Sequence, residues 1–447
     1  MICNNHLSYF CAVGKALFYF CIFFLVVLSF RFYSSNYYSN LCSDDAVIIL
    51  MLHDYHLPHD IYFWGQDRYG SLIPLLGQIF LKVFHFSAIS SESITHFLLY
   101  ILGYFGFASL FKNKCYKLLF AIIWFFPPYR MLDLLRNTLS IQCSLIGIAI
   151  LIINIIHNIK ENNVKKHVLL TLLVLTFISV VWVSDLAIVS IFLLLVIFIL
   201  RFYVRNKSIA PIFKKIEFYY SVFGTIIAAI FIYYAKNHAE KVENYSGSND
   251  INTIIASFKI FFDSIVDFFS FQSEEKFTSI YLYLVTIAIV YLFFNIKKIK
   301  IAEDKRKWLL FFLLDAAIVF LVILFSKWSY LNGVPRRYFV GIYISLSMAF
   351  ILCLENLIIN KKIKNIFISY VFIAVSIAGI GAIYNLKYVF PGTLIPKVDL
   401  VSEFKSLGNI GIVGGYWTAY ISSVPDPDNI KATPTSTEPW SVRNKKL

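Results

Sequence analysis

Two adjacent carboxylates follow the first long apolar stretch of the chain, in Ser43-Asp44-Asp45-Ala46. Paired acids beside a membrane are costly unless they are solvated, ion-paired or bound to a metal. A carboxylate in this place can act as a general base that takes the proton from an attacking hydroxyl. The alternative is a helix cap, because Ser43 or Asp44 could start a helix over 46–53. The two interpretations are compatible, since a capped helix would hold a catalytic Asp44 or Asp45 rigidly.

Arginines in two later polar segments have the chemistry to hold a phosphate. One segment follows a Pro-Pro pair and contains Arg136; the other contains Lys327, Arg336 and Arg337 directly before an apolar stretch. Guanidinium groups bind phosphate oxygens through paired hydrogen bonds. The alternative is that these long side chains reach lipid headgroups for solvation alone. Three cations in the second segment favour an anionic ligand there.

The segment 63–71 mixes aromatic, amide and charged side chains with two glycines. Such a mixture could form a platform for a sugar or a lipid phosphate. Its candidate contacts are Trp64, Gln66 and Tyr69, with Arg68 as a further phosphate ligand. The alternative is an anchor at the level of the lipid headgroups, where aromatic side chains are common. The residue types leave both interpretations open.

Three histidines at a spacing of three, His53, His56 and His59, stand beside acidic residues. Histidines and carboxylates together could form a metal site. Pro58 interrupts a helix in this segment, so the three side chains would not share one face. A polar loop is the favoured interpretation, and no metal ligand is assigned.

Two single acids lie beside or inside apolar stretches. Asp185 stands in the short turn Trp182-Val183-Ser184-Asp185, where a helix cap is favoured over a second active-site acid. Asp315 lies in the middle of an apolar stretch, where an acid is a functional candidate by default. We expect Asp315 to form hydrogen bonds inside a helix bundle, with a proton relay as the alternative.

The composition indicates that a membrane-spanning helix bundle positions these side chains. The chain has 447 residues, of which 59% are hydrophobic and 15% charged, whereas soluble domains are about a quarter charged. A helix of about 20 apolar residues can cross a bilayer. We therefore expect an all-α polytopic membrane protein with about 11 transmembrane helices. The expected spans are 15–33, 93–111, 118–127, 139–156, 168–182, 186–203, 218–235, 278–295, 308–325, 338–355 and 366–384.

The segment 71–86 determines the direction of the chain through the membrane. It is apolar but short, and it contains Pro74 and Lys82, so we expect an interfacial helix. On this assumption the loops that face one side hold half of the 40 Lys and Arg residues. The positive-inside rule makes that side cytoplasmic. A crossing at 71–86 would invert this bias.

This topology divides the chain into two parts. Residues 1–385 form the transmembrane domain, in which 34–92 is a first outer loop and 236–277 a second long outer loop. Residues 386–447 form an outer C-terminal tail with a strand-like run at 410–417, followed by a Pro-, Asp-, Asn- and Thr-rich stretch typical of a loop. The tail can form at most a small cap on the outer face.

An acidic pair in a long outer loop after the first span resembles the GT-C superfamily of membrane glycosyltransferases. The protein O-mannosyltransferases and the lipid A aminoarabinose transferases belong to that superfamily. The segment 71–86 looks like its interfacial helix before the second span, and the loop with Arg136 looks like its second outer loop. Arg337-Tyr338 resembles an Arg-Tyr pair that often opens a late span. The superfamily more often has Asp-Glu in place of Asp44-Asp45, which leaves the identity of the base open.

The resemblance implies sugar transfer at the outer face of a cell membrane, expected to be a bacterial inner or plasma membrane. The donor would be a sugar on a polyprenyl phosphate, and the acceptor a hydroxyl of a glycan, lipid or protein of the cell envelope. Asp44 or Asp45 would act as general base, and the bond from C1 to the phosphate would break with inversion. The cations that would neutralise the leaving phosphate are Arg136 and Arg337, assisted by Arg336, Lys327 or Arg68. No cofactor is required, although a divalent metal is possible, since some relatives use one.

Two other classes of membrane protein stay open as alternatives. A flippase or transporter for lipid-linked sugars would need many spans, and a polysaccharide polymerase or ligase of another membrane fold would share long outer loops with arginines. The spans are nearly free of charge and the polar residues gather in outer loops, which favours surface chemistry over transport. No Gly-rich phosphate loop indicates a nucleotide-sugar site. Cytoplasmic loops explain the net charge of +14, and no nucleic acid partner is expected.

Overall fold

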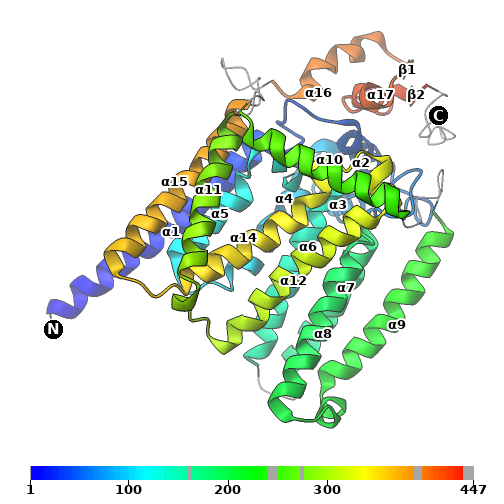
Figure 1. The fold of residues 1–447 in the computed structure, drawn as a ribbon. Coiled ribbons are helices and arrows are strands. Elements are labelled where there is room, and N and C mark those ends of the chain that lie inside the picture. Colours follow the sequence, from blue (N-terminus) through cyan, green and yellow to red (C-terminus); the bar gives the residue numbers. More distant parts are fainter. Residues whose placement is uncertain are drawn as a thin grey trace.

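The computed structural model describes residues 2–135, 137–159, 164–239, 249–271, 276–385 and 395–435. Nine helices of this described part are long and apolar enough to cross a membrane, and they run side by side in one bundle (Figure 1). The expected all-α polytopic architecture is confirmed. These helices are α1 (Ile2–Tyr33), α6 (Asn137–His157), α7 (Val164–Val183), α8 (Ala187–Asn206), α9 (Ile216–Asn237), α11 (Lys276–Phe294), α12 (Glu303–Phe325), α14 (Val340–Glu355) and α15 (Lys361–Asn385).

Two further helices of the bundle correspond to the remaining expected spans, 93–111 and 118–127. Helix α4 (Ala88–Ala108) has 21 residues and begins with a polar, serine-rich turn. Helix α5 (Lys114–Phe125) has only 12 residues, which at 1.5 Å per residue extend about 18 Å. The apolar core of a bilayer is about 30 Å thick. Helix α5 is therefore too short to cross by itself, and it lies buried among its neighbours.

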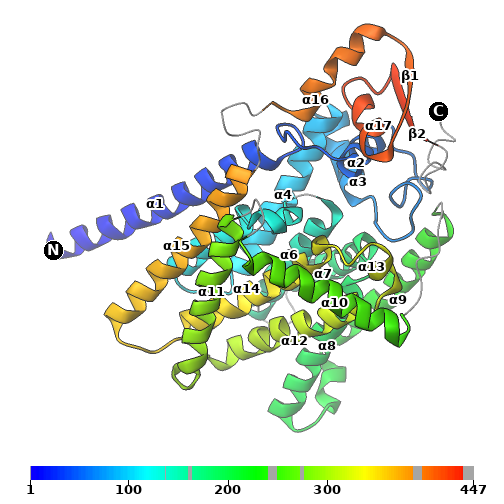
Figure 2. The ribbon, with the colours of Figure 1, turned by 45° about the horizontal axis from the view of Figure 1, so that its top comes forward.

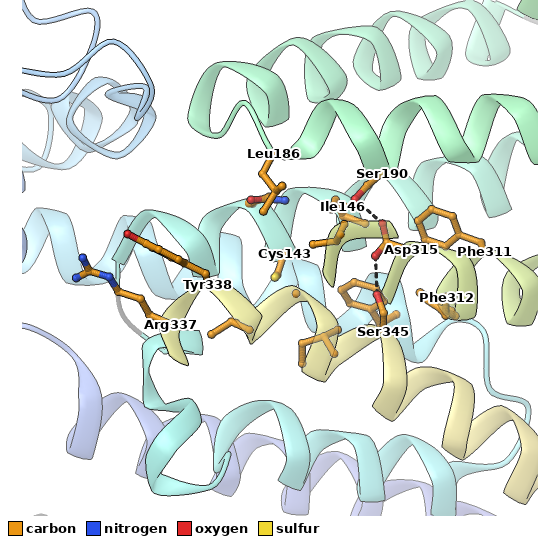
Figure 3. A pocket seen from close by; sticks show the side chains of 16 residues that line it. Cys143, Ile146, Leu186, Ser190, Phe311, Phe312, Asp315, Arg337, Tyr338 and Ser345 are labelled. Atoms are coloured by element: carbon orange, nitrogen blue, oxygen red, sulfur yellow. Dashed lines mark hydrogen bonds between the residues drawn. The ribbon is translucent and has the colours of Figure 1, made fainter. Parts of the chain in front are cut away.

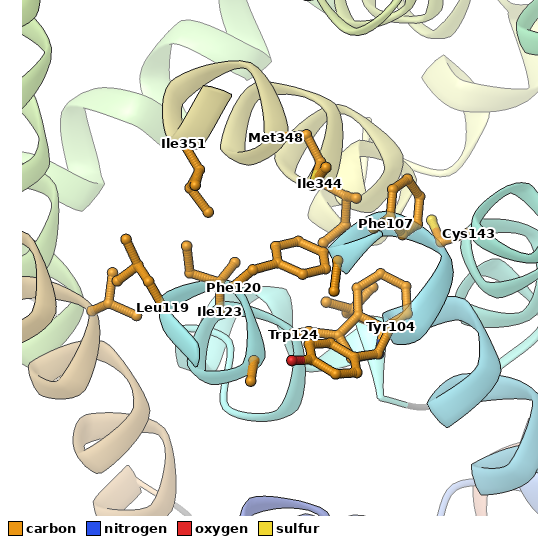
Figure 4. Packing of buried hydrophobic residues seen from close by; sticks show 14 of the residues in the cluster. Tyr104, Phe107, Leu119, Phe120, Ile123, Trp124, Cys143, Ile344, Met348 and Ile351 are labelled. Atoms are coloured by element: carbon orange, nitrogen blue, oxygen red, sulfur yellow. The ribbon is translucent and has the colours of Figure 1, made fainter. Parts of the chain in front are cut away.

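Aromatic side chains from α4 and α5 form the centre of the main core (Figure 4). The ring centroids of Tyr104 and Phe120 are 6.0 Å apart, and those of Phe107 and Trp124 are 5.5 Å apart. The buried indole N–H of Trp124 donates to the backbone oxygen of Tyr100 at 3.1 Å. A buried polar group without such a partner would be costly, so this hydrogen bond lets the short helix α5 sit inside the bundle.

Glycines bring α4 and α6 into close backbone contact. A Cβ atom added at Gly106 would overlap the backbone of Gly147, and one at Gly103 would overlap the backbone of Ser144. Small residues allow this kind of close approach between membrane helices. The contact fixes the position of α6, whose first turn lies beside the polar end of the bundle.

Short helices gather at one end of the bundle (Figures 1 and 2). Helix α3 lies where the interfacial helix 71–86 was expected, and α10 lies in the segment 236–277 that was expected to be a loop. The short helices at this end are α2 (Ser43–His53), α3 (Leu72–Lys82), α10 (Ile251–Phe269) and α13 (Lys327–Leu331). The 3-10 helices of the described part do not all lie at this end, since η2 belongs to the connection between α8 and α9. They are η1 (Tyr129–Leu134), η2 (Ala210–Lys214), η3 (Ile296–Lys298), η4 (Arg336–Phe339) and η5 (Ser402–Leu407).

The described part of the C-terminal tail forms a small β-α-β unit at the same end of the molecule (Figure 2). Its strands are parallel, with Ile410 opposite Ile430. The second strand lies in the stretch that was expected to be a loop, so that expectation is wrong. Tyr420 and Ile421 pack into the core around α2. The elements are α16 (Lys397–Leu400), β1 (Ile410–Gly414), α17 (Tyr416–Ser423) and β2 (Ile430–Pro434).

Candidate functional site

Asp45 caps the first turn of α2. Its Oδ2 atom accepts hydrogen bonds from the backbone N–H of Cys42, at 3.2 Å, and from the Cys42 thiol, at 3.1 Å. Cys42 is therefore the N-cap residue, and the expectation that Ser43 or Asp44 starts the helix as its cap is wrong. Only 5% of Asp45 is exposed. A buried carboxylate that holds a helix end has little freedom to reach a substrate.

Asp44 lies on a more open side of the same turn. Its side chain is 22% exposed, and its Oδ2 atom is 3.9 Å from Nη1 of Arg337. This distance describes an ion pair across a narrow gap, since a direct hydrogen bond would be about 2.7–2.9 Å long. The partial positive charge at the helix N-terminus also favours an anion there. The sequence left the two acids equivalent, and the geometry separates them.

A tight turn between α13 and η4 positions Arg337. Gly333 has a positive φ of 71°, a conformation that favours glycine. Its N–H donates to the backbone oxygen of Tyr330 at 2.8 Å, and the N–H of Val334 donates to the backbone oxygen of Ser329 at 2.8 Å. The chain then enters η4 and α14, so Arg337 lies directly before the start of α14.

Two stacked aromatic rings lie between Arg337 of this ion pair and a second cation, Arg68. The Arg68 guanidinium carbon lies 4.7 Å from the centroid of the Trp328 ring. The rings of Trp328 and Tyr338 are stacked, with centroids 3.8 Å apart, and the Arg337 guanidinium carbon lies 5.5 Å from the centroid of the Tyr338 ring. We call Arg68, Trp328, Tyr338 and Arg337 the cation–aromatic stack. Sequence analysis missed Trp328, whose only signal was its place beside Lys327.

The segment that carries Arg68 is held against the end of α7 through Gly70. The N–H of Gly70 donates to the backbone oxygen of Trp182 at 2.9 Å, and the Trp182 indole donates to the backbone oxygen of Ile61 at 2.9 Å. The Nε atom of Arg68 donates to Oε1 of Gln66 at 3.2 Å. A Cβ atom at position 70 would overlap Trp182, so glycine is needed there. Gln66 thus orients Arg68.

The other residues of the expected platform have separate surroundings. The Trp64 indole donates to Oδ1 of Asp60 at 3.0 Å, which turns its polar atom toward the loop itself. Tyr69 lies beside Arg68, with the guanidinium carbon 5.5 Å from its ring centroid. Burial raises the pKa of Tyr69, and the nearby charge of Asp44 adds to this effect while Arg68 and Arg337 oppose it. Tyr69 therefore belongs to the charged cluster, and Trp64 belongs to the supporting loop.

Asp185 forms an ion pair. Its Oδ2 atom accepts a hydrogen bond from Nζ of Lys236 at 2.7 Å. Burial raises the pKa of Asp185, and the hydrogen bond from Lys236 opposes this rise. No side chain caps the start of α8, so the expectation of a cap at Asp185 is wrong. The charge of Asp67 also raises the pKa of Asp185, and that of Arg68 lowers it.

Three of the expected cations lie apart from the cluster or outside the described residues. Arg336 is exposed, and its guanidinium carbon is 6.0 Å from the centroid of the Tyr129 ring. Lys327 is exposed at the start of α13. Arg136 lies outside the described residues. The structure therefore brings together Asp44, Arg68 and Arg337 from the predicted set.

An apolar cleft leads from Arg337 and Tyr338 into the bundle (Figure 3). Asp315 lies at its inner part, where Ser190 donates to its Oδ1 atom at 2.6 Å and Ser345 donates to its Oδ2 atom at 2.8 Å. These hydrogen bonds connect α8, α12 and α14. The expected hydrogen bonding of Asp315 inside the bundle is confirmed, and a proton relay stays a prediction.

The three histidines His53, His56 and His59 do not converge on one point. His53 contacts Asp428 in the tail at 3.0 Å, His56 contacts Asp54 at 2.6 Å, and His59 contacts Asp60 at 2.9 Å. Each imidazole thus faces a different carboxylate. Within the described ranges, no three His, Cys, Asp or Glu side chains are grouped so that they could hold a metal ion. These three histidines therefore do not fit a metal centre.

Sequence comparisons identify no relative, and structural comparison identifies a fold. No family model and no curated protein sequence matches the chain. The oligosaccharyltransferase of Archaeoglobus fulgidus, solved with zinc and sulfate, matches with a TM-score of 0.50 and 12% identity. The match covers 93% of this chain and 62% of the oligosaccharyltransferase. This chain therefore spans less than two thirds of the length of that protein.

A second structure from Archaeoglobus fulgidus is also similar. The oligosaccharyltransferase AglB, in complex with an inhibitory peptide and a dolichol-phosphate, matches with a TM-score of 0.46 and 13% identity, over 94% of this chain and 64% of that one. At such low identity, structural likeness is informative about fold. The first match shows that this chain has the fold of the GT-C membrane glycosyltransferases, as the acidic pair and the arrangement of spans led us to expect.

Proposed function

We propose that the protein is a GT-C glycosyltransferase that moves a sugar from a polyprenyl-phosphate donor to a hydroxyl acceptor at the outer face of the cell membrane. The proposal rests mainly on the distance of 3.9 Å between Oδ2 of Asp44 and Nη1 of Arg337. These two residues come from the first and the last third of the chain. A carboxylate that faces a guanidinium supplies the base and the cation that such a reaction needs. The fold supports the same reaction class.

Asp44 is the proposed general base. A neutral hydroxyl is a weak nucleophile, and a base that removes its proton contributes about 10²–10⁴-fold to the rate. Asp44 has an exposed fraction of 22% and faces Arg337, whereas Asp45 accepts hydrogen bonds from the backbone N–H and the thiol of Cys42. Asp44 is thus the better candidate of the two acids. The attack on C1 from the side opposite the phosphate would invert the configuration at that carbon.

Arg337 and Arg68 are the proposed ligands of the donor phosphate. The bond between C1 and the phosphate oxygen breaks as negative charge develops on the leaving phosphate, and preorganised cations stabilise that charge. The cation–aromatic stack holds both guanidinium groups on one wall. C1 of the donor must lie between base and cations, so we expect Arg337 and Asp44 to separate when the donor binds. The exposed Arg336 and Lys327 are proposed to assist from the rim.

A paired substitution tests the proposed function. Purified protein is incubated with labelled polyprenyl-phosphate sugars and cell-envelope acceptors, and products are identified by mass spectrometry. We expect Asp44→Asn to lower kcat at least 100-fold, as the loss of a general base implies. The matched control is the neighbouring Asp45→Asn, which we expect to reduce thermal stability through the weakened cap while a measurable kcat remains.

The test also separates the proposal from its alternatives. Sugar transfer that is unchanged in Asp44→Asn would overturn the assignment of the base. A wild-type protein that moves lipid-linked sugars across vesicle membranes but forms no transfer product would instead support a flippase. The acceptor class, whether glycan, lipid or protein, is identified by the same mass spectra.

A further inference from the structure

Helix α10 has one face that packs on the wall of the candidate site. The ring centroid of Phe261 lies 4.9 Å from that of Phe320 in α12 and 5.1 Å from that of Phe339 in η4. Phe258 reaches the same Phe320 ring at 6.1 Å. Phe339 stands two positions after Arg337, so the inner face of α10 contacts the segment that carries the candidate phosphate ligand.

A second apolar face of α10 is exposed. Ile251, Ile255, Phe262 and Val266 are 76%, 62%, 55% and 67% exposed. Their spacing of four, seven and four residues aligns them along one side of a helix. We call these four residues the outer stripe. An apolar stripe of this length would be unfavourable in water, because burial of apolar surface contributes about 25 cal/mol per Å².

Polar side chains follow the edge of the outer stripe. Asn252, Lys259, Asp263 and Asp267 are exposed, and at 100° per residue they lie on the side of the helix next to the stripe. The helix thus has a packed face, an apolar exposed face and a polar exposed face. An apolar face beside a charged face is typical of helices that lie in the plane of a membrane surface.

The position of α10 matches that role. Figures 1 and 2 show it running across the ends of the spans, from α11 towards α9. Its last turn is fixed by Tyr283 of α11, whose hydroxyl donates to the backbone oxygen of Phe269 at 2.8 Å. Arg130 of η1 binds Asp267 at 3.1 Å. These contacts make α10 a fixed part of the bundle end.

Helix α10 packs on two spans that have exposed apolar side chains. Tyr283 is 42% exposed on α11, and the neighbours of Phe320 on α12, Leu321 and Val322, are also exposed. Helices α11 and α12 are long and apolar enough to cross a membrane, so their exposed apolar faces contact lipid. The outer stripe belongs to a helix that packs on α11 and α12 where these spans end, so we expect it to meet the same bilayer.

We propose that α10 is an interfacial helix whose outer stripe is embedded at the boundary between lipid headgroups and acyl chains. Lys259 reaches the headgroup phosphates from the edge of the stripe, as long cationic side chains do at membrane surfaces. Because the inner face of α10 packs on η4, this helix fixes the depth of the Arg337 segment relative to the bilayer surface. The proposal rests on the packing and exposure of α10 and holds whether or not the protein transfers sugars.

Site-specific photocrosslinking tests the proposal. The photoreactive amino acid p-benzoyl-phenylalanine is placed, one position at a time, at Ile255, Phe262 or Val266 of the full chain, and at Asn252 or Asp263 as controls. All five side chains are exposed, so the substitutions do not enter the core. The proteins are reconstituted in vesicles of phosphatidylethanolamine and phosphatidylglycerol, irradiated, and analysed by peptide mass spectrometry.

The stripe positions are expected to give phospholipid adducts in at least tenfold higher yield than the controls. Phe262 and Asp263 are the sharpest pair, because they are neighbours in the chain and differ in the side of the helix they occupy. Equal lipid yields at these two positions would overturn the proposal. Crosslinks from the stripe to a second copy of the chain would also overturn it, and would identify the stripe as a dimer surface.

Discussion

Asp44 and Asp45 are adjacent in the chain, but their surroundings differ: Asp45 caps a helix, and Asp44 faces a cation. The backbone N–H and the thiol of Cys42 both point at Asp45, and its burial removes it from any path to a substrate. Asp44 faces a cation across a gap of 3.9 Å. One acid thus stabilises the helix end, and the other faces Arg337, because consecutive residues of a helix point 100° apart.

Trp328 is predicted to keep the two arginines of the cation–aromatic stack in place. It lies between Arg68 and the Tyr338 ring, and a cation–aromatic contact contributes about 0.5–2 kcal/mol. We expect Trp328→Ala to raise the KM for the lipid-linked donor about tenfold, which corresponds to 1.4 kcal/mol, with a smaller effect on kcat. Trp328→Phe keeps a ring in the stack and is expected to recover most of the affinity. Steady-state kinetics at varied donor concentration measure both.

Residue types predicted part of this site, and geometry was needed for the rest. Asp44, Arg68 and Arg337 could be selected because charged side chains are rare in a chain that is 15% charged. The choice between Asp44 and Asp45 depends on which atoms cap α2, and a sequence does not contain that information. Trp328 was missed because an aromatic residue near a membrane span is common, and only its stacking reveals its role.

The contact between α4 and α6 allows a prediction about whole helices. We expect Gly106→Ala to lower the thermal midpoint strongly and to reduce the yield of folded protein, because the added methyl group overlaps the backbone of Gly147. The matched control is Gly341→Ala in α14, where a Cβ atom meets nothing within 4 Å. Alanine is favoured over glycine in a helix by about 0.5–1 kcal/mol, so the control is expected to be neutral or slightly stabilising. Thermal unfolding in detergent measures both, and equal midpoints would contradict the prediction.

The long apolar spans and the interfacial helix α3 could be predicted from the sequence, whereas helix α10 could not. The long spans have runs of apolar residues that need no partner to be recognised. Helix α10 contains Lys259, Asp263 and Asp267. These charged residues interrupt its apolar positions, and the segment was therefore predicted to be a loop. Strand β2 was missed for a related reason. It stands among turn-forming residues, and it is stabilised by pairing with β1, a segment that is not its neighbour in the sequence.

The two ends of the whole bundle differ in the kind of residues they carry. One end holds α2, α10, α13 and the β-α-β unit, where the candidate site lies (Figure 2). The end of α8 and its connection to α9 lie at the other end (Figure 1). They carry Arg205 in the last turn of α8, and Lys207, Lys214 and Lys215 in the connection. Clusters of Lys and Arg in short loops keep those loops in the cytoplasm. The asymmetry therefore predicts that the candidate site faces outward.

Two exposed lysines at opposite ends of the molecule provide a test of that orientation. Lys405 lies in η5 of the tail, and Lys207 ends α8. We expect Lys405→Cys to react with a membrane-impermeant maleimide in intact cells, and Lys207→Cys to react only after the cells are opened. The parental chain has seven cysteines, so each variant is scored by its gain in labelling over that chain. Labelling of Lys207→Cys in intact cells, with Lys405→Cys protected, would place Asp44 in the cytoplasm and contradict transfer at the outer face. Since a polyprenyl-phosphate donor can be used only on the side where its headgroup is displayed, this measurement constrains the source of the substrate as well as the direction of the chain.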